Sequence, residues 1–176
     1  IIDASIVAEK NSSAKSHFFS KSNKKLDFAY FDEVDLSFQL EQVTNDTYLK
    51  TYKIKSPIVS DYNSLKSSDA IEAYKESFIF NADLQVYENL SKENNDRYEY
   101  IFPNYNLTKE FNIDEKINGN FSLNSSGYMK NYDTNILEKV VINDFIYNSN
   151  PKFTNLGLVN NYNLLVKNIN TDSKNS

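Results

Sequence analysis

The chain has 176 residues, a formal net charge of −5 and no cysteine. An acidic balance gives little electrostatic support for nucleic-acid binding, and the absence of cysteine excludes disulfide scaffolds, thiolate zinc sites and thiol nucleophiles within this segment. With only three glycines and three prolines, collagen-like and proline-rich sequences are also excluded, while 13 tyrosines and 12 phenylalanines supply much of the apolar content.

Apolar and polar residues alternate along the first third of the chain, and this period of two predicts β-strands. A short example consists of Leu26, Phe28 and Tyr30. A longer one occupies residues 34–43 and places four apolar side chains on one side, from Val34, Leu36, Phe38 and Leu40. A polar turn string follows at 44–47. We therefore expect the 34–43 strand to form a hairpin with a strand at 48–54.

The middle of the chain predicts a second hairpin. Apolar residues alternate from Phe78 to Val86, and another extended run begins at Tyr98 beyond the polar string 92–96. We expect 78–90 to pair with 98–102. The segment 69–74 has weak helical spacing, and we interpret it as a strand.

Apolar and polar residues also alternate in the last third of the chain. Phe121 and Leu123 open one strand, and Tyr162, Leu164 and Val166 alternate in the last one. Another candidate region contains Tyr128, Tyr132 and Ile136. The residues 135–146 fit either a short helix or a strand, because their apolar residues also recur at helical spacing.

Long strands with one apolar and one polar face are typical of two kinds of protein. A transmembrane β-strand needs about nine to eleven residues, apolar towards lipid and polar towards the lumen. A soluble antiparallel sheet with one wet face gives the same alternation. The pattern alone leaves both alternatives open, with a fold class of antiparallel all-β in either case.

The most informative stretch is 96–107, where an aromatic side alternates with a charged one. Tyr98, Tyr100 and Phe102 fall on one side of an extended chain. Pro103 interrupts the run, and proline lacks the N–H group that a central strand donates to its neighbour. This combination predicts a strand end or a bend at the rim of a sheet or barrel.

Residues able to carry chemistry are few. The chain has one histidine, His17, which we interpret as a structural or interface residue because a zinc site needs three or four protein ligands. Asp32, Glu33 and Asp35 form an acidic cluster, either a solvated turn or a calcium site. No Gly-x-Ser-x-Gly elbow and no glycine-rich phosphate loop occurs. We therefore expect no catalytic residue, no metal and no cofactor.

Several segments resemble, in order, the outer-membrane family of LPS-assembly proteins called LptD, or OstA, the organic solvent tolerance protein. The segments that carry the resemblance are Ser16–Phe19 (Ser-His-Phe-Phe), Asn45–Tyr52 (Asn-Asp-Thr-Tyr-Leu-Lys-Thr-Tyr), Asn63–Ser67, Asp96–Tyr105 and Gly119–Gly127. Each motif is unspecific alone, whereas the ordered set is much more specific. One departure is Asn118-Gly119, where the family has paired glycines.

The resemblance implies a fold and a function. Residues 1–176 would be an arc of antiparallel, up-and-down strands in the C-terminal transmembrane β-barrel, with the N-terminal jelly-roll domain and the closing strands outside the segment. The barrel would insert lipopolysaccharide into the outer leaflet of the outer membrane of a Gram-negative bacterium. Its partners would be lipopolysaccharide, outer-membrane lipid, an LptE-type lipoprotein plug and an LptA-type periplasmic bridge.

Five tyrosines are candidates for a membrane-interface girdle, where amphipathic rings settle in outer-membrane barrels. They are Tyr48, Tyr52, Tyr98, Tyr100 and Tyr105. Stabilisation of cross-strand pairs explains the same tyrosines equally well. The alternative function is a soluble or surface-exposed β-sandwich, such as an adhesin module, which would show Greek-key crossings and two sheets packed face to face.

Overall fold

A computed structural model describes residues 1–8, 10, 13–111, 118–133 and 135–175. Its long strands are β1 (Ile2–Val7), β2 (Lys15–Leu26), β3 (Glu33–Val43), β4 (Ser64–Lys75), β5 (Phe78–Asn89), β6 (Tyr98–Phe111), β7 (Gly119–Tyr132), β8 (Ile136–Ser149) and β11 (Asn163–Asn175). The short elements are the helix α1 (Tyr48–Thr51), the 3-10 turn η1 (Asn94–Arg97), and the strands β9 (Lys152–Phe153) and β10 (Val159–Asn160).

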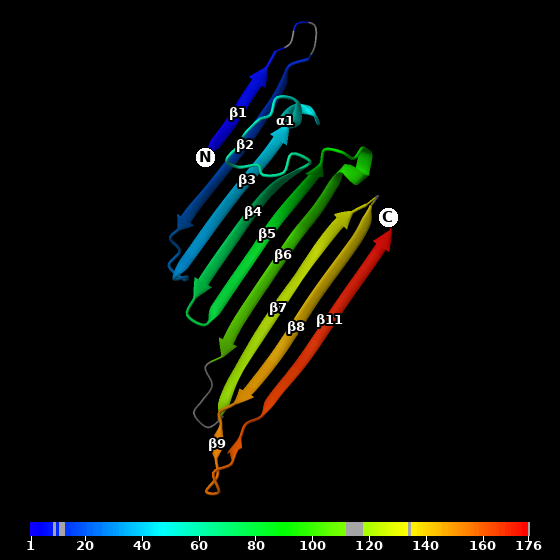
Figure 1. The fold of residues 1–176 in the computed structure, drawn as a ribbon. Helices are drawn as coiled ribbons and strands as arrows, with labels where there is room; N and C mark the ends of the chain where they lie inside the picture. The colour runs from blue at the N-terminus through cyan, green and yellow to red at the C-terminus, as the bar shows by residue number, and fades with distance from the viewer. Residues whose placement is uncertain (9, 11–12, 112–117, 134, 176) are drawn as a thin grey trace.

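The long strands form one nine-stranded antiparallel sheet in the order β1-β2-β3-β4-β5-β6-β7-β8-β11 (Figure 1). Each strand pairs with its neighbour in sequence, and only β8 and β11 are separated by other strands, the small β9–β10 hairpin. Within the described residues the sheet is open, with β1 and β11 at its edges. The chain is therefore all-β, with an up-and-down meander.

This pairing confirms two of the sequence predictions and decides one alternative that the sequence left open. The hairpin of 78–90 with 98–102 is β5 with β6, which pair from Phe78↔Lys109 to Glu88↔Tyr98. The segment 69–74 is a strand inside β4. The undecided segment 135–146 belongs to strand β8, so the helical alternative is wrong.

The predicted hairpin of 34–43 with 48–54 is wrong. Residues 48–51 form α1, and β3 pairs with β4 instead. Asn45 initiates the change of direction, because its side-chain oxygen accepts hydrogen bonds from the Thr47 backbone N–H at 3.1 Å and the Thr47 hydroxyl at 2.9 Å. The long connection 44–63 therefore folds back over the sheet.

No helix among the described residues is long and apolar enough to cross a membrane.

The short strand predicted at Leu26, Phe28 and Tyr30 is also wrong beyond its first residue. β2 ends at Leu26, and the Phe31 N–H donates to the Phe28 carbonyl at 3.1 Å to close a turn. The Phe31 ring then contacts the Phe78 ring at a centroid distance of 6.2 Å. The aromatic residues of this connection pack on the end of the sheet instead of extending β2.

Pro103 lies inside β6, in a β-bulge. Asn104 and Ile101 pair with Asp83 and Gln85 of β5, so three residue steps on β6 oppose two on β5, and the same shift occurs against β7. The extra residue of a bulge is left out of the ladder, which suits a residue without an N–H group. The predicted strand end is therefore wrong, because Pro103 lies at an irregularity within β6, which is paired on both sides.

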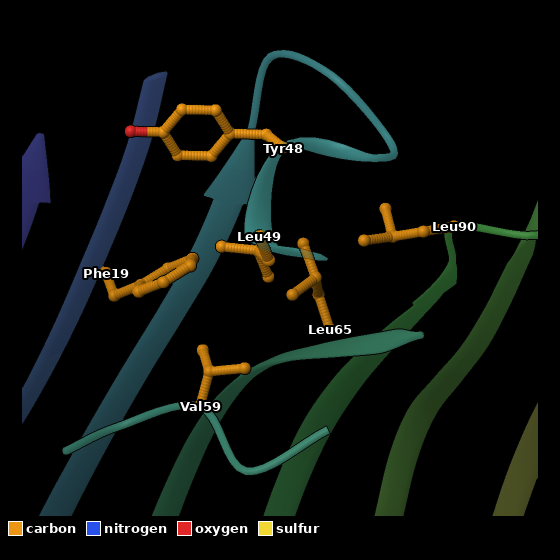
Figure 2. Close-up of a cluster of buried hydrophobic side chains, with 6 residues drawn as sticks. All are labelled: Phe19, Tyr48, Leu49, Val59, Leu65 and Leu90. Carbon is orange, nitrogen blue, oxygen red and sulfur yellow. The ribbon is translucent and has the colours of Figure 1, made fainter. Parts of the chain in front are cut away.

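The well-buried core is small and lies at one end of the sheet (Figure 2). Side chains from β2, α1, the 44–63 connection, β4 and the residue after β5 converge there, and the cluster consists of Phe19, Tyr48, Leu49, Val59, Leu65 and Leu90. Phe19, Tyr48 and Leu49 are completely buried. The core therefore fixes the 44–63 connection to the sheet, and most of the sheet extends beyond it.

Candidate functional site: the two faces of the sheet

The strand register divides the side chains of the sheet into two faces, because residues directly opposite in an antiparallel pair point the same way. One row crosses the middle of the six strands β3 to β8, and its members are Leu36, Ile71, Ala82, Tyr105, Gly127 and Val141. We call the side to which this row points the apolar face. It also carries Phe38, Phe80, Leu84, Leu107, Leu123 and Phe145.

The neighbouring row, shifted by one residue on every strand, points to the opposite side. On β3 to β7 its members are Asp35, Glu72, Asn81, Asn106 and Ser126, and the row continues through Ile142 on β8 and Ile169 on β11. We call this side the polar face. Further along it, Asn104 donates to Asp83 at 2.8 Å, and Lys167 lies 2.9 Å from Asp144. These polar side chains therefore pair with one another, although the buried Oδ1 atom of Asp144 has no hydrogen-bond partner among the described residues.

Large apolar side chains are exposed across the whole apolar face. Exposed fractions reach 39% at Leu36, 42% at Leu84 and 49% at Phe145, on three well-separated strands. Isolated exposed apolar residues are ordinary, but soluble monomers rarely expose a contiguous apolar area of this extent. The apolar face therefore exposes large apolar side chains on several strands, interspersed with polar ones such as Asp69, Lys109 and Asn143.

Aromatic residues gather at both ends of the apolar face. At the end near α1, the Tyr98, Tyr100 and Phe102 rings stack in succession at centroid distances of 6.0 and 5.8 Å. At the opposite end, the register aligns Phe111 with Phe121 and Phe121 with Tyr147. Aliphatic, aromatic and polar residues lie between the two groups. The second group was not anticipated from the sequence, because only the register places its members on one line.

Three of the five candidate girdle tyrosines lie on the apolar face. Tyr98 and Tyr100 belong to the stacked group, and Tyr105 lies nearer the middle. The Tyr105 ring lies over Gly127, where a Cβ would come within 2.8 Å of its Cε1 atom and 2.6 Å of the Val140 carbonyl oxygen. Gly127 thus permits this close approach. The girdle role itself stays a prediction.

The other two candidate tyrosines lie elsewhere. Tyr48 is completely buried in the core, and Tyr52 packs against it with ring centroids 5.2 Å apart. The completely buried Tyr48 ring cannot reach a membrane interface, and the Tyr52 ring is partly buried against the same core. We therefore restrict the girdle hypothesis to the tyrosines of the apolar face.

His17 belongs to a polar network that ties the edge strand β1 to β2 and α1. Its Nε2 atom lies 3.2 Å from an Asp3 carboxylate oxygen, and its Nδ1 lies 3.1 Å from the Ser5 hydroxyl. The Ser5 hydroxyl also bonds the Tyr48 hydroxyl at 2.7 Å. The imidazole stacks on Phe19 at 4.5 Å and is only 4% exposed. An imidazole held at both nitrogens and buried is a structural contact, although sequence reasoning had missed its partners Asp3 and Ser5.

Tyr48→Phe is expected to destabilise the protein by about 0.5–1.5 kcal/mol, the usual net contribution of one hydrogen bond. The ring keeps its packing, while Ser5 loses the hydroxyl partner that joins β1 to α1. Denaturant unfolding measures the loss. Tyr62→Phe is the matched control, because that ring also packs against the core but its hydroxyl lies outside this network. Equal losses in both variants would contradict the assignment.

Arg97 makes a second link between distant segments. Its guanidinium donates to both carboxylate oxygens of Asp46, at 2.9 and 2.6 Å, and its Nε donates to Glu88 at 2.8 Å. The connection after β3, strand β5 and the start of β6 are thereby joined. The hydrogen bonds from Arg97 lower the pKa of the Asp46 carboxyl below its usual range.

Acid is expected to remove the stabilisation that the Asp46–Arg97 pair gives to the fold. A lowered folded-state pKa means that Asp46 stabilises the fold above pH 3.8, its unfolded value, and that this stabilisation disappears as the pH falls through the folded value. Because Asp46 is half exposed, the effect is at most about 1 kcal/mol. Wild type and Asp46→Asn should differ in their unfolding curves at pH 7, and the two curves should converge as the pH falls below the folded-state pKa of Asp46. A difference that persists in acid would contradict the assignment.

The predicted acidic cluster is dispersed among local contacts. Asp32 accepts a hydrogen bond from the Glu76 backbone N–H at 2.9 Å, and Glu33 pairs with Lys25. Within the described residues, no three His, Cys, Asp or Glu side chains gather to hold a metal ion. The cluster thus occurs as a paired turn at the end of the sheet opposite α1.

Comparisons with family models, curated proteins and solved structures give no match for this chain. The two faces of the sheet and the ordered sequence motifs are thus the features of this chain that bear on its function.

Proposed function

We propose that this chain forms part of the wall of an outer-membrane β-barrel, with the apolar face towards lipid and the polar face towards the lumen. The observation that carries the proposal is the opposition of the two faces over the same strands. Leu36, Ile71 and Ala82 form one row, whereas Asp35, Glu72 and Asn81 form the next. Barrel strands alternate in this way because lipid cannot satisfy polar groups.

The dimensions of the sheet fit this proposal. On β5 the apolar residues run from Phe78 to Val86, about 26 Å along the strand at 3.3 Å per residue. A tilt of about 40° shortens this to about 20 Å of height, and the aromatic groups extend it towards the apolar band of about 25 Å in outer-membrane barrels. The meander also matches the up-and-down order of such barrels.

The open edges of the sheet are consistent with an arc of a larger barrel. β1 and β11 present unpaired backbone groups at opposite sides of the sheet. In lipid such groups need partners, and closure of a barrel supplies them. Further strands of the same barrel would continue the ladder at these two edges.

The connections suggest an orientation. The end near α1 carries the longest connection, 44–63, whereas the other end carries the turn Glu76–Ser77 between β4 and β5 together with the connection 150–162 between β8 and β11. Outer-membrane barrels have long extracellular loops and short periplasmic turns. We therefore assign the α1 end to the outside and the opposite end to the periplasm.

The ordered motifs favour one function among outer-membrane barrels, that of the LPS-assembly family. In that function the barrel takes lipopolysaccharide from an LptA-type bridge, encloses an LptE-type lipoprotein plug and inserts its cargo into the outer leaflet. The polar face provides a hydrated lumen for the plug and for the saccharide part of the cargo. None of these steps requires covalent chemistry from the wall.

Photo-crosslinking in cells tests this function. A photoreactive residue at Asn106, on the polar face, is expected to capture lipopolysaccharide or the plug during transport, whereas one at Leu84, on the apolar face, is expected to capture membrane lipid. The polar-face adduct should disappear when lipopolysaccharide export is blocked. Recovery of the protein in the soluble fraction, without lipid adducts at Leu84, would contradict the proposal.

The alternative of a soluble β-sandwich has less support. A sandwich covers the apolar face of one sheet with a second sheet. The second sheet among the described residues is the β9–β10 hairpin, which extends from the end of the large sheet instead of covering it (Figure 1). The strand order shows hairpin connections without a Greek-key crossing in the part of the chain that is described.

A further inference from the structure

The connection 44–63 packs on the polar face of the sheet. Phe19, a member of the buried cluster, pairs directly with Glu41 of β3. Glu41 and Asp35 are both odd-numbered residues of β3, so they point to the same side of a strand whose side chains alternate. Asp35 belongs to the row that defines the polar face. The buried cluster that holds the connection is therefore on the polar side.

Phe18 and Phe19 show the difference between the two faces. They are adjacent on β2 and therefore point to opposite sides of the sheet. Phe19 is completely buried, whereas Phe18 is 43% exposed. Phe38, on the apolar face of the neighbouring strand β3, is exposed as well. In water, we would expect the apolar side chains of a connection to cover this exposed apolar surface. The connection covers the opposite side instead.

The helix α1 lies over the polar side of the two strands at this edge of the sheet. Ser5 of β1 pairs with His17, and His17 comes two residues before Phe19 on β2, so all three point to the polar face. The Tyr48 hydroxyl bonds the Ser5 hydroxyl at 2.7 Å. The Tyr48 ring also lies 5.7 Å from the His17 imidazole, measured between the ring centroids. These contacts attach the connection to the face of the sheet as well as to its end.

The connection after α1 is folded and returns to the same cluster. A hydrogen bond from the Ile54 N–H to the Leu49 carbonyl at 3.0 Å closes the end of α1. Val59 then enters the buried cluster beside Leu49 (Figure 2). Between them, Lys53 and Lys55 are exposed and give the connection a hydrated surface. The connection is thus a built element with one side packed on the sheet and one side towards water.

We propose that the connection 44–63 narrows the lumen of the barrel at the α1 end and restricts the passage of ions and small solutes there. This inference rests on the proposed function, which assigns the polar face to the lumen. A connection packed on the polar face occupies part of the cross-section of the lumen, whereas one packed on the apolar face would lie in lipid. The buried cluster holds the connection against the wall, so the constriction is a fixed part of the structure.

Ionic current through the full-length protein in planar lipid bilayers tests the constriction. In one variant, residues 48–60 are replaced by a short glycine-serine linker, which removes α1 and Val59 together. The expected result is a higher conductance than that of the wild type, because the lumen is wider without the packed connection. A protein whose residues 154–158 are shortened in the same way is the control, because that turn extends from the opposite end of the sheet (Figure 1). Its conductance should equal that of the wild type.

A fluorescent label at Leu84→Cys on the apolar face keeps the two proposals separate. Lipid contact at Leu84 without a rise in conductance on removal of 48–60, including the case in which neither protein conducts, overturns the constriction and leaves the barrel intact. A label at Leu84 that remains in water overturns the barrel, and the constriction with it. An equal rise in the control also overturns the assignment to the connection.

Modification of a single introduced thiol is a second test that does not remove any part of the fold. A bulky thiol reagent on Lys53→Cys, in a protein without other cysteines, is expected to reduce the current, because it adds volume at the constriction. Glu93→Cys is the matched control, an exposed position in the connection between β5 and β6 at the same end of the sheet. An unchanged current after complete modification of Lys53→Cys, or an equal fall at both positions, overturns the proposal.

Discussion

Ala82→Arg is expected to prevent assembly of the protein in a membrane, whereas Asn81→Arg, one residue earlier, is expected to assemble normally. Ala82 lies between Ile71 and Tyr105 in the middle row of the apolar face. An arginine on the lipid side of a barrel costs about 2–4 kcal/mol at the bilayer midplane. The measurement is the fraction of protein that becomes protease-resistant and heat-modifiable after addition of lipid vesicles.

Asn81→Arg introduces the same side chain on the same strand. Asn81 lies opposite Glu72 and Asn106 on the polar face, so the new guanidinium gains a carboxylate neighbour and remains hydrated. Because both variants add the same side chain, any difference between them reports the effect of the face and not the size or charge of arginine. In a soluble sheet both variants would alter stability by only about 0.5 kcal/mol, as exposed substitutions do. Equal assembly of both would contradict the membrane proposal.

The strands were largely predictable from the sequence, because alternation is a local property. The run from Phe78 to Val86 shows it without interruption, and its pairing partner follows after one polar string. The prediction was wrong for 48–54, where Tyr48, Tyr52 and Ile54 also alternate with polar residues. There the burial of Tyr48 and Leu49 together against the sheet outweighs local strand preference.

The two faces were only partly predictable. Alternation predicts that each strand has an apolar side, but it does not give the register that joins these sides into one surface. The line from Phe111 through Phe121 to Tyr147 depends on register alone. The bulge at Pro103 then shifts the pairing of β6 by one residue, so counting along the sequence assigns later residues to the wrong side.

The buried network around His17 was not predictable either. Asp3 and Ser5 alternate on β1, and only the pairing Ser5↔His17 brings their side chains to the imidazole. Tyr48 reaches the same point through a connection whose path had been predicted as a strand. Contacts of this kind depend on three segments at once, and no spacing within any one of them encodes the contact.

The second large effect is expected from Leu49→Ala. Leu49 is completely buried where α1 packs on the sheet, so the truncation removes apolar contact and leaves a cavity among Phe19, Val59 and Leu65 (Figure 2). Such truncations cost about 2–5 kcal/mol. Denaturant unfolding measures the global loss. Leu156→Ala removes the same atoms from a side chain that is 87% exposed, and its cost should stay within about 0.5 kcal/mol.

Hydrogen exchange of backbone amides shows which part of the structure loses stability in Leu49→Ala. The Thr51 N–H donates to the Thr47 carbonyl at 2.8 Å and the Tyr52 N–H to the Tyr48 carbonyl at 3.1 Å, so both amides report the attachment of α1. Because the core joins the 44–63 connection to an otherwise thin sheet, these amides should exchange faster in the variant, while amides in β7 and β8 change less. Uniform acceleration across all strands would instead mean that this small core holds the whole sheet together. Unchanged exchange at Thr51 and Tyr52 would contradict the role of Leu49 as the anchor of the connection.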